Sequence, residues 1–339
     1  MSTISVIGAG AWGTALAQML SAEGTPVTLW AREAGLAEAI NRGAGNQPYL
    51  PGAALAPTIR ATSDLAEAGT ADIALLVTPA QHLGTVLAAM PAVPRDLVLC
   101  AKGIEAGSLR LLHQVARAHA PEAEIAVLSG PTFAHEVAAG LPTAVTLACG
   151  GGQAQWDRLA PAIARRTFRP YYTDDVTGAE VGGAVKNVLA IACGVVEGLG
   201  LGLNARAALI SRGYAELLRF GTALGGRAET LAGLCGLGDL VLTCSSTNSR
   251  NFSLGKALGE GQAPAALLTD RRTVAEGAHT APVLAELAGK RGVAMPISDA
   301  VHRLLLGAPA RAIADALLAR PLVAEGPRIE GPRIEGRAG

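Results

Sequence analysis

Residues 4–17, ISVIGAGAWGTALA, decide the fold of this chain. A short β-branched apolar run leads through a glycine-rich turn into a helical period, and in this context a G-x-G-x-x-G pattern indicates a phosphate-binding loop. Gly8 permits the tight turn, Gly10 lets the backbone approach a pyrophosphate, and Gly13 allows the helix to pack closely on the strand. The free N–H groups and the helix dipole then face the anion. We predict a dinucleotide site; the alternative is an ordinary turn in a glycine-rich chain.

Further apolar, β-branched runs follow along the first half of the chain, with helical patterns between most of them. They occupy residues 27–30, 71–78, 96–101, 125–128 and 144–148. Such runs, alternating with helices, are typical of a parallel sheet that is covered on both faces. The sequence therefore predicts an α/β fold whose N-terminal domain is a Rossmann-type, doubly wound parallel sheet.

The pattern changes after about Val176, where strand-like runs nearly vanish. Alanine- and leucine-rich helical periods take over at 205–224, 282–290 and 298–306. We predict a Rossmann domain over residues 1–180 and an all-α domain over 181–324. Residues 325–339 repeat GPRIE and form a flexible tail, because a charged Pro/Gly repeat cannot build a packed core. The tail ends in IEGR, which fits either an added protease site or a natural low-complexity segment.

Composition limits the classes of partner. The 28 Lys+Arg residues balance the 28 Asp+Glu residues, so no net field attracts nucleic acid or an anionic membrane. No apolar run is long enough for a membrane span, and the N-terminus lacks the features of a signal peptide. The five cysteines are odd in number and widely spaced, which favours reduced thiols and a cytoplasmic location. The six histidines form no metal-spaced cluster, so no metal is expected.

Glycine is abundant, at 42 of 339 residues. Several glycines fall in the loops assigned to ligands, but Gly194, Gly198, Gly200 and Gly202 interrupt or end a helical period. For these we expect close packing of a helix against the first domain.

The end of the second predicted strand bears on the choice of cofactor. An acidic residue there would accept the ribose hydroxyls of NAD, but this chain has Trp30-Ala31-Arg32. Arg32 is suited to pair with a 2′-phosphate, so NADP is favoured over NAD. The alternative is that Arg32 is merely solvated, with Glu33 beside it.

Three polar segments follow or interrupt apolar elements. Lys102 and the Ser129–Thr132 segment each come directly after a predicted strand, at the edge of the sheet where ligands of α/β proteins bind; the second could instead be only a turn. Lys186 interrupts the apolar helical stretch 185–196. Because burial lowers the pKa of a lysine, Lys186 is a candidate general acid–base; otherwise it snorkels at the domain junction.

Two further polar segments lie in the predicted helical domain. Asp239 stands among apolar residues, where it orients Lys186 or caps a helix. Ser249, Arg250 and Asn251 group a hydroxyl, a guanidinium and an amide, which are suitable donors for a substrate phosphate unless the loop is simply solvated.

Taken together, the chain resembles the bacterial NAD(P)-dependent glycerol-3-phosphate dehydrogenases from Ile4 to about Ala319. The segments that carry this resemblance are GAGAWGTALA (8–17), LWAR (29–32), NQPYLPG (46–52), AKGIE (101–105), SGPTFAHEV (129–137), VKN (185–187), GLGDLVLTC (236–244), SRN (249–251) and AEGAHTA (275–281). The resemblance implies a C-terminal domain of the 6-phosphogluconate-dehydrogenase type and a homodimer. It implies reduction of dihydroxyacetone phosphate to sn-glycerol 3-phosphate for phospholipid synthesis.

The resemblance also implies roles for individual residues. Ala11, Trp12 and Arg32 would contact the cofactor, and Ala134, Val274 and Glu276 would hold its nicotinamide half. Lys186 would be the proton donor and acceptor, with Asp239 beside it. The remaining ligand contacts would come from Lys102, Gly130, Thr132, Ser249, Arg250 and Asn251 for the substrate, with Lys102 and Arg250 also near the dinucleotide. The chain departs from the commoner family pattern at Ala11, Thr132 and Ala278, where serine, serine and valine are usual.

Two other functions fit parts of the sequence. A β-hydroxyacid or ketopantoate-type reductase also combines such a fold with an active-site lysine, but the SRN and NQPYLPG segments argue against it. A redox-sensing module that binds a dinucleotide without turnover would not require Lys102, Lys186 and Asp239 in one chain.

Overall fold

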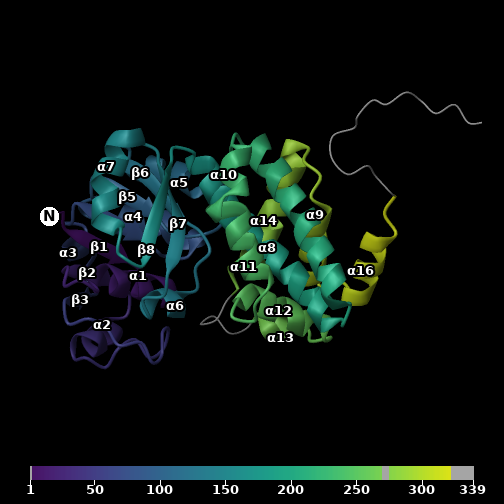
Figure 1. Ribbon diagram of the computed structural model, residues 1–339, viewed down its shortest axis with the longest axis horizontal. Helices are drawn as coiled ribbons and strands as arrows, with labels where there is room; N and C mark the ends of the chain where they lie inside the picture. The colour runs from purple at the N-terminus through teal and green to yellow at the C-terminus, as the bar shows by residue number, and fades with distance from the viewer. Residues whose placement is uncertain (1, 269–274, 322–339) are drawn as a thin grey trace, which may run out of the picture.

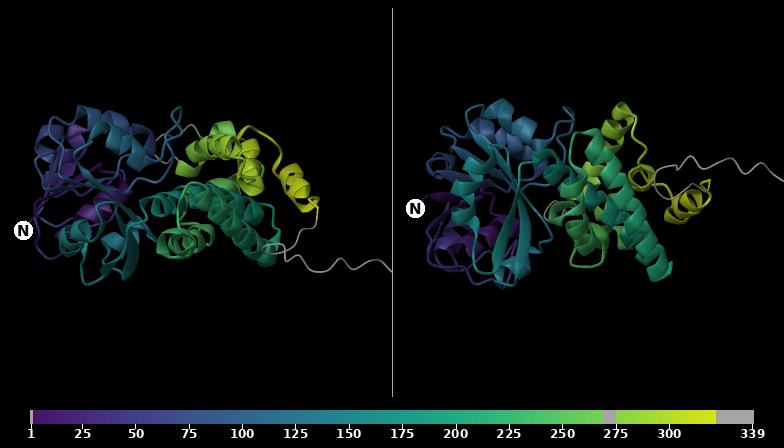
Figure 2. Two further views of the ribbon diagram at one scale, coloured as in Figure 1. Left: turned by 90° about the horizontal axis from the view of Figure 1, so that it is seen from above. Right: turned by 45° about the horizontal axis from the view of Figure 1, so that its top comes forward.

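A computed structural model describes residues 2–268 and 275–321, which form two domains that lie side by side (Figure 1). Two other views show the same division, with the sheet in one domain and a bundle of helices in the other (Figure 2). The predicted tail, residues 325–339, and the predicted cofactor residue Val274 lie outside the described residues.

The N-terminal domain contains one sheet with strand order β3-β2-β1-β4-β5-β6-β7-β8. Its strands are β1 (Ile4–Ile7), β2 (Val27–Trp30), β3 (Ile59–Thr62), β4 (Ile73–Leu76), β5 (Asp96–Leu99), β6 (Glu124–Ser129), β7 (Thr143–Cys149) and β8 (Phe168–Thr173). Its helices are α1 (Ala11–Ser21), α2 (Ala34–Asn41), α3 (Leu65–Ala68), the 3₁₀ turn η1 (Ala80–His82), α4 (Leu83–Ala89), α5 (Leu112–His119), α6 (Ala134–Ala138) and α7 (Gly152–Ile163).

Helices cover both faces of this sheet. Leu16 of α1 and Leu159 of α7 belong to the core on one face, whereas Leu87 of α4 and Val115 of α5 belong to the core on the other. The central strands β1, β4 and β5 are buried along their whole length, as the continuous apolar runs predict. The predicted doubly wound α/β fold is confirmed.

The sheet is not wholly parallel, which corrects the prediction. Strand β7 pairs antiparallel with β6, while the other neighbouring strands pair in parallel. The β6–β7 connection carries only the short helix α6, which packs against α1 instead of crossing a face of the sheet. The chain therefore returns in the opposite direction. Strands β3 and β8 were not predicted, because each is an edge strand with a mixed polar and apolar sequence.

The C-terminal domain is helical throughout its described residues. It comprises α8 (Val176–Gly198), α9 (Gly202–Ala223), α10 (Ala228–Ala232), the π-helical turn η2 (Leu234–Gly238), α11 (Asp239–Cys244), α12 (Arg250–Gly259), α13 (Pro264–Leu267), α14 (Glu276–Arg291), α15 (Pro296–Leu305) and α16 (Ala310–Leu318). A division after residue 180 stays a prediction; in the structure β8 ends at Thr173 and α8 begins at Val176.

Helix α8 is the centre of this domain and packs against α9, α11, α12, α14 and α15. It is the one helix among the described residues with the length and apolar composition of a membrane span. Because 94% of its most apolar window is buried inside the protein, it is a core helix.

Glycines let α8 approach α12 to backbone contact. A Cβ on Gly194 would lie 2.0 Å from the Phe252 carbonyl oxygen, and one on Gly255 would lie 2.0 Å from that of Ile191. Gly198 meets α12 in the same way, so the expected packing against the first domain is wrong: these glycines pack two helices of the second domain together. Gly200, between α8 and α9, and Gly202, the first residue of α9, instead have positive φ angles of 67° and 86°.

Candidate active site at the junction of the two domains

The loop from Gly8 to Gly13, called the phosphate loop below, joins β1 to α1. Gly8 has φ +120°, and a Cβ on Gly13 would lie 1.8 Å from the Gly8 carbonyl oxygen. Gly10 differs, because a Cβ there would meet nothing within 4 Å. Gly8 and Gly13 are therefore required by the backbone conformation and packing of the loop itself. Gly10 is not, and it leaves open space at the start of α1.

The groups around the phosphate loop fit a bound dinucleotide. Helix α1 begins at Ala11 with no side-chain cap, so its first N–H groups are left for an anion. The buried Trp12 Nε1 and the buried hydroxyl of Thr78 have no hydrogen-bond partner within the described residues. Thr78 lies beside the loop, since its backbone nitrogen is 3.1 Å from the position of a Cβ on Gly8.

Two other predicted cofactor residues of this domain are Arg32 and Ala134. Arg32 follows β2, and its side chain is 78% exposed and forms a 2.9 Å ion pair with the Glu33 carboxylate. Ala134 begins α6 and packs against the core beneath α1. The structure thus gives Arg32 a surface position with an acidic neighbour.

At the domain junction, four side chains form what we call the lysine cluster: Lys102, Lys186, Asp239 and Thr243. The Asp239 carboxylate accepts a hydrogen bond from Lys186 Nζ at 2.8 Å through one oxygen and from Lys102 Nζ at 2.6 Å through the other. Lys186 Nζ also donates to Thr243 Oγ1 at 2.9 Å. Lys102 follows β5 and Lys186 lies on α8, so Asp239 links the two domains and orients both lysines.

Burial and charge together set the proton affinities in the lysine cluster. Burial lowers the pKa of Lys186 to about 8, against the opposing effect of the Asp239 carboxylate, and the nearby Lys102 lowers it further. Burial alone would raise the pKa of Asp239, but the two ammonium groups hold it below its ordinary value. An ionised carboxylate thus stands beside a lysine that can exchange a proton near neutral pH.

The turn after β6 faces Lys102. The Gly130 carbonyl accepts from Lys102 Nζ at 3.4 Å and from the hydroxyl of Thr132 at 3.3 Å. A Cβ on Gly130 would lie 2.9 Å from Val145 Cα, so glycine is required for the approach to β7. The hydroxyl of the preceding Ser129 is buried without a partner within the described residues and lies close to Gly183 of α8.

The segment Ser249–Asn251 begins α12. The Ser249 hydroxyl oxygen caps the helix by accepting from the Phe252 N–H, while its own hydrogen stays available as a donor. Arg250 is exposed, and its side chain has no ion pair or hydrogen bond within the described residues. Asn251 is buried; its Nδ2 donates to the Asn187 side chain at 2.9 Å, and its oxygen accepts from the Gly277 N–H.

Glu276, the first residue of α14, lies on the same side of the junction. Its carboxylate accepts from Asn187 Nδ2 at 3.5 Å. Burial raises the pKa of Glu276, while the positive charges of Arg250 and Lys102 oppose this effect. Hydrogen bonds therefore connect Glu276 to Asn251 through Asn187, the residue next to Lys186.

The sequence prediction missed two residues of this site, Asn187 and Thr243. Both stand in motifs that were singled out, VKN and GLGDLVLTC. Thr243 is four residues after Asp239, a spacing that places both on one face of a helix. That spacing could have identified Thr243, whereas the link from Asn187 to Asn251 and Glu276 joins segments that are distant in the sequence.

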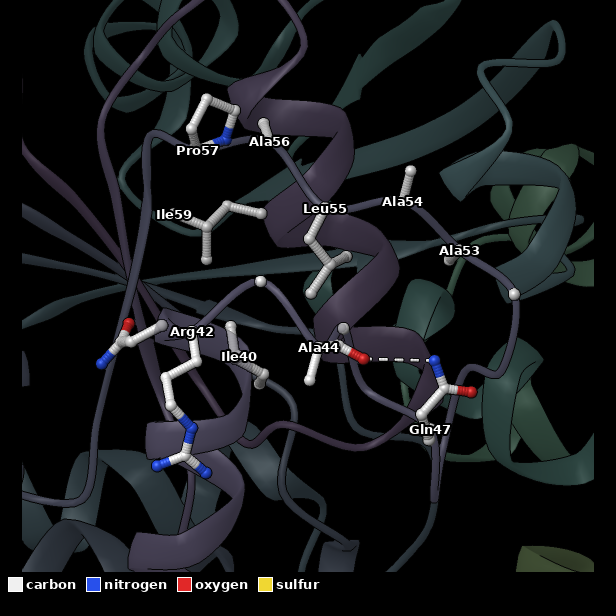
Figure 3. Close-up of a pocket in the computed structure, with 14 residues that line it drawn as sticks. Ile40, Arg42, Ala44, Gln47, Ala53, Ala54, Leu55, Ala56, Pro57 and Ile59 are labelled. Atoms are coloured by element: carbon white, nitrogen blue, oxygen red, sulfur yellow. Dashed lines mark hydrogen bonds between the residues drawn. The ribbon is translucent and has the colours of Figure 1, made fainter.

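A separate hollow of about 510 Å³ lies between α2 and the connection that leads to β3 (Figure 3). The side chains of Ile40, Leu55 and Ile59 point toward its middle. No predicted catalytic or binding residue lines it.

A Rossmann domain that carries a phosphate loop, joined to a helical domain that contributes a buried lysine, defines a two-domain dinucleotide-dependent dehydrogenase. The family model for the NAD-dependent glycerol-3-phosphate dehydrogenase N-terminus matches residues 3–155, and that for the C-terminus matches residues 175–313. The chain therefore belongs to the NAD-dependent glycerol-3-phosphate dehydrogenase family.

Individual relatives are similar along nearly their whole length. A glycerol-3-phosphate dehydrogenase [NAD(P)+] of Erythrobacter litoralis is 67% identical over 322 residues, covering 95% of this chain and 97% of the relative. One from Novosphingobium aromaticivorans is 68% identical over 327 residues, covering 96% and 99%. The crystal structure of glycerol-3-phosphate dehydrogenase from Coxiella burnetii, 39% identical, superposes with a TM-score of 0.89 over 94% of this chain and 99% of that one.

Proposed function

We propose that this chain catalyses the reversible reduction of dihydroxyacetone phosphate to sn-glycerol 3-phosphate with NAD(P)H, as a source of the glycerol phosphate used in phospholipid synthesis. Membership of the family supports the reaction. The observation that carries the mechanism is the position of Lys186: it is buried at the domain junction and held by Asp239 and Thr243.

The dinucleotide would lie on the phosphate loop, with its pyrophosphate at the open face of Gly10 and the uncapped start of α1. Ala11 and Trp12 would contact it there, with Arg32 at its adenosine end. Its nicotinamide half would lie near Ala134, Lys102, Arg250 and Glu276, and Val274, outside the described residues, is proposed by family resemblance alone. When bound, the reduced dinucleotide supplies the hydride.

Lys186 is the proposed proton donor for reduction. As a ketone carbon accepts a hydride, negative charge develops on its oxygen. The Lys186 ammonium stabilises this charge and transfers one proton from Nζ to the oxygen, which gives the alcohol. In the oxidation direction the neutral amine takes the proton back. Asp239 keeps the amine oriented throughout.

The substrate phosphate would be held mainly by Arg250, with Ser249 and Asn251 beside it. Arg250 has no protein partner within the described residues, so its guanidinium fork is available to an anion. Asn251 Nδ2 uses one hydrogen on Asn187 and keeps the second for the substrate. Lys102, Gly130 and Thr132 would line the opposite side, since Lys102 reaches the Gly130 carbonyl. Binding energy from the phosphate would orient the distant ketone carbon.

Cofactor preference, location and assembly belong to the proposal as well. Arg32 favours NADP, although the Glu33 carboxylate beside it competes for the guanidinium. All five cysteines are buried and unpaired, which supports a cytoplasmic location. A homodimer is proposed on family resemblance alone.

One assay tests the proposed reaction and its alternatives together. Oxidation of NADH and of NADPH is followed by absorbance with dihydroxyacetone phosphate, and with a 2-keto acid such as ketopantoate as the control. We expect turnover with dihydroxyacetone phosphate only. Turnover with ketopantoate alone would support the reductase alternative, and cofactor binding without any turnover would support a sensing module.

A further inference from the structure

A buried asparagine outside the predicted site contacts the phosphate loop. Asn46 lies in the connection between α2 and β3, within the NQPYLPG segment, and is 1% exposed. Its Nδ2 donates to the Ala9 carbonyl oxygen at 2.8 Å and to Thr14 Oγ1 at 2.7 Å. Because the Ala9 carbonyl can only accept, the amide must present its NH₂ group to the loop, and both of its hydrogens are used there.

The contact with Ala9 fixes the direction of one N–H group. The Ala9 carbonyl and the Gly10 N–H belong to the same peptide, and in a planar trans peptide these groups point in opposite directions. Holding the carbonyl toward Asn46 therefore turns the Gly10 N–H away from Asn46. Gly10 is also the position whose Cβ would meet only open space.

The contact with Thr14 fixes the first turn of α1. The Thr14 N–H bonds the Gly10 carbonyl at 2.9 Å, so Thr14 closes the turn whose free N–H groups face the loop. Asn46 is itself held in place through its main chain, because its backbone carbonyl accepts from the Leu50 N–H at 2.8 Å. A single side chain thus anchors both ends of the peptide segment from Ala9 to Thr14.

We propose that Asn46 is a positioning residue for dinucleotide binding. It acts through Ala9 and Thr14 and sets the orientation of the Gly10 N–H and of the start of α1 before a pyrophosphate arrives. The loop is then already ordered before the dinucleotide binds, so the free energy of binding is not reduced by the entropic cost of ordering it. The inference rests on the proposed dinucleotide site at the phosphate loop.

Asn41, the last residue of α2, offers a control that lies close by in the sequence. Asn41 Nδ2 donates to the Ala61 carbonyl at 2.8 Å, and Asn41 Oδ1 accepts from the Ala61 N–H at 2.8 Å. Like Asn46, it makes two side-chain hydrogen bonds within the N-terminal domain, but its partner is the edge strand β3. Replacing either asparagine by alanine removes two hydrogen bonds. Only the replacement of Asn46 removes a hydrogen bond to the phosphate loop.

The test compares Asn46→Ala with Asn41→Ala in the full chain. The dissociation constant of NADH is measured by titration, unfolding by urea, and kcat and KM for dihydroxyacetone phosphate at saturating NADH. We expect both variants to lose stability, but only Asn46→Ala to raise the dissociation constant, by about tenfold. In Asn46→Ala, kcat and the KM for dihydroxyacetone phosphate stay within about twofold of the wild-type values, because the lysine cluster is untouched.

An unchanged dissociation constant in a folded Asn46→Ala variant, with a loss of stability like that of Asn41→Ala, would overturn the inference. Where Asn46→Ala does not fold, Thr14→Val decides. It removes the hydroxyl that accepts from Asn46 and that itself donates to the Ala9 carbonyl at 3.4 Å, so it should weaken NADH binding by about threefold, while Thr14→Ser restores it. Equal NADH affinity in all Thr14 variants would also overturn it. A wild-type chain that binds neither NADH nor NADPH would instead contradict the proposed cofactor site.

Discussion

The phosphate loop and the lysine cluster are built in opposite ways. The phosphate loop comes from one contiguous stretch, and its shape depends on backbone that a Cβ would obstruct at Gly8 and Gly13. The lysine cluster is made of side chains from segments up to 137 residues apart, and its geometry depends on one buried carboxylate. A backbone site therefore fails through steric overlap, whereas a side-chain site fails through lost charge.

The largest expected effect is the loss of the Lys186 ammonium. Lys186→Met keeps the volume of the side chain but removes the proton donor and the positive charge at the developing oxyanion. We expect kcat for reduction to fall by about 10³-fold, with the dissociation constant of NADH changed less than about twofold. Steady-state kinetics and NADH titration measure the two effects.

Lys290→Met provides the control, since Lys290 is exposed and paired with Glu286 on α14. It should leave both constants unchanged. Turnover of Lys186→Met within tenfold of the wild type would remove Lys186 from the proposed mechanism.

Arg250→Ala should have the next largest effect. The variant removes the proposed guanidinium contact with the substrate phosphate, so kcat/KM for dihydroxyacetone phosphate should fall by about 10²-fold, mostly through KM. Because Arg250 is exposed and forms no ion pair within the described residues, stability should hardly change. A kcat/KM equal to that of the wild type would refute the phosphate role.

Two glycine substitutions test which glycines of the phosphate loop are needed for folding and which for dinucleotide binding. Gly13→Ala puts a methyl group against the Gly8 carbonyl and should lower the free energy of unfolding by about 2 kcal/mol. Gly10→Ala meets no protein atom within 4 Å, so it should fold normally but bind NADH about tenfold more weakly. Urea unfolding and NADH titration of both variants separate the effects. Equal free energies of unfolding for Gly13→Ala and Gly10→Ala would contradict the assignment of Gly13 to folding and Gly10 to binding.

The smallest effect is expected at the cofactor's adenosine end. Arg32→Ala should raise KM for NADPH by about threefold and leave KM for NADH unchanged, because an exposed ion-paired arginine contributes little. Parallel assays with the two cofactors measure this difference. If neither KM changes, Arg32 is simply solvated.

The contrast between the two regions also explains what the sequence could predict. The phosphate loop, the central strands and the helical second half have local signatures, namely glycine spacing and apolar periodicity. Lys102, Lys186 and Asp239 could be selected as polar residues at strand ends or in apolar surroundings. Their convergence on a single carboxylate could not be derived, because it depends on how two domains meet.

The features that the sequence did not predict also depend on contacts between segments that are distant in the sequence. The antiparallel β7 depends on where α6 packs, and α6 packs against a helix that is more than 100 residues earlier in the chain. Gly194 and Gly198 of α8 approach α12 where Gly255 and Gly259 allow it, which no periodicity within α8 can reveal. Asn46 likewise acts on a loop 32 to 37 residues away.

The central claim is that Asp239 holds Lys186 as a proton donor, and the pH dependence of kcat/KM for reduction tests it most directly. Burial lowers the pKa of Lys186 to about 8 and the Asp239 carboxylate opposes that decrease, so wild-type kcat/KM should fall as pH rises through about 8. In Asp239→Asn the opposing charge is gone, and the fall should occur at lower pH. The same pH limb in both proteins, or a rate that rises with pH through this range, would contradict the account.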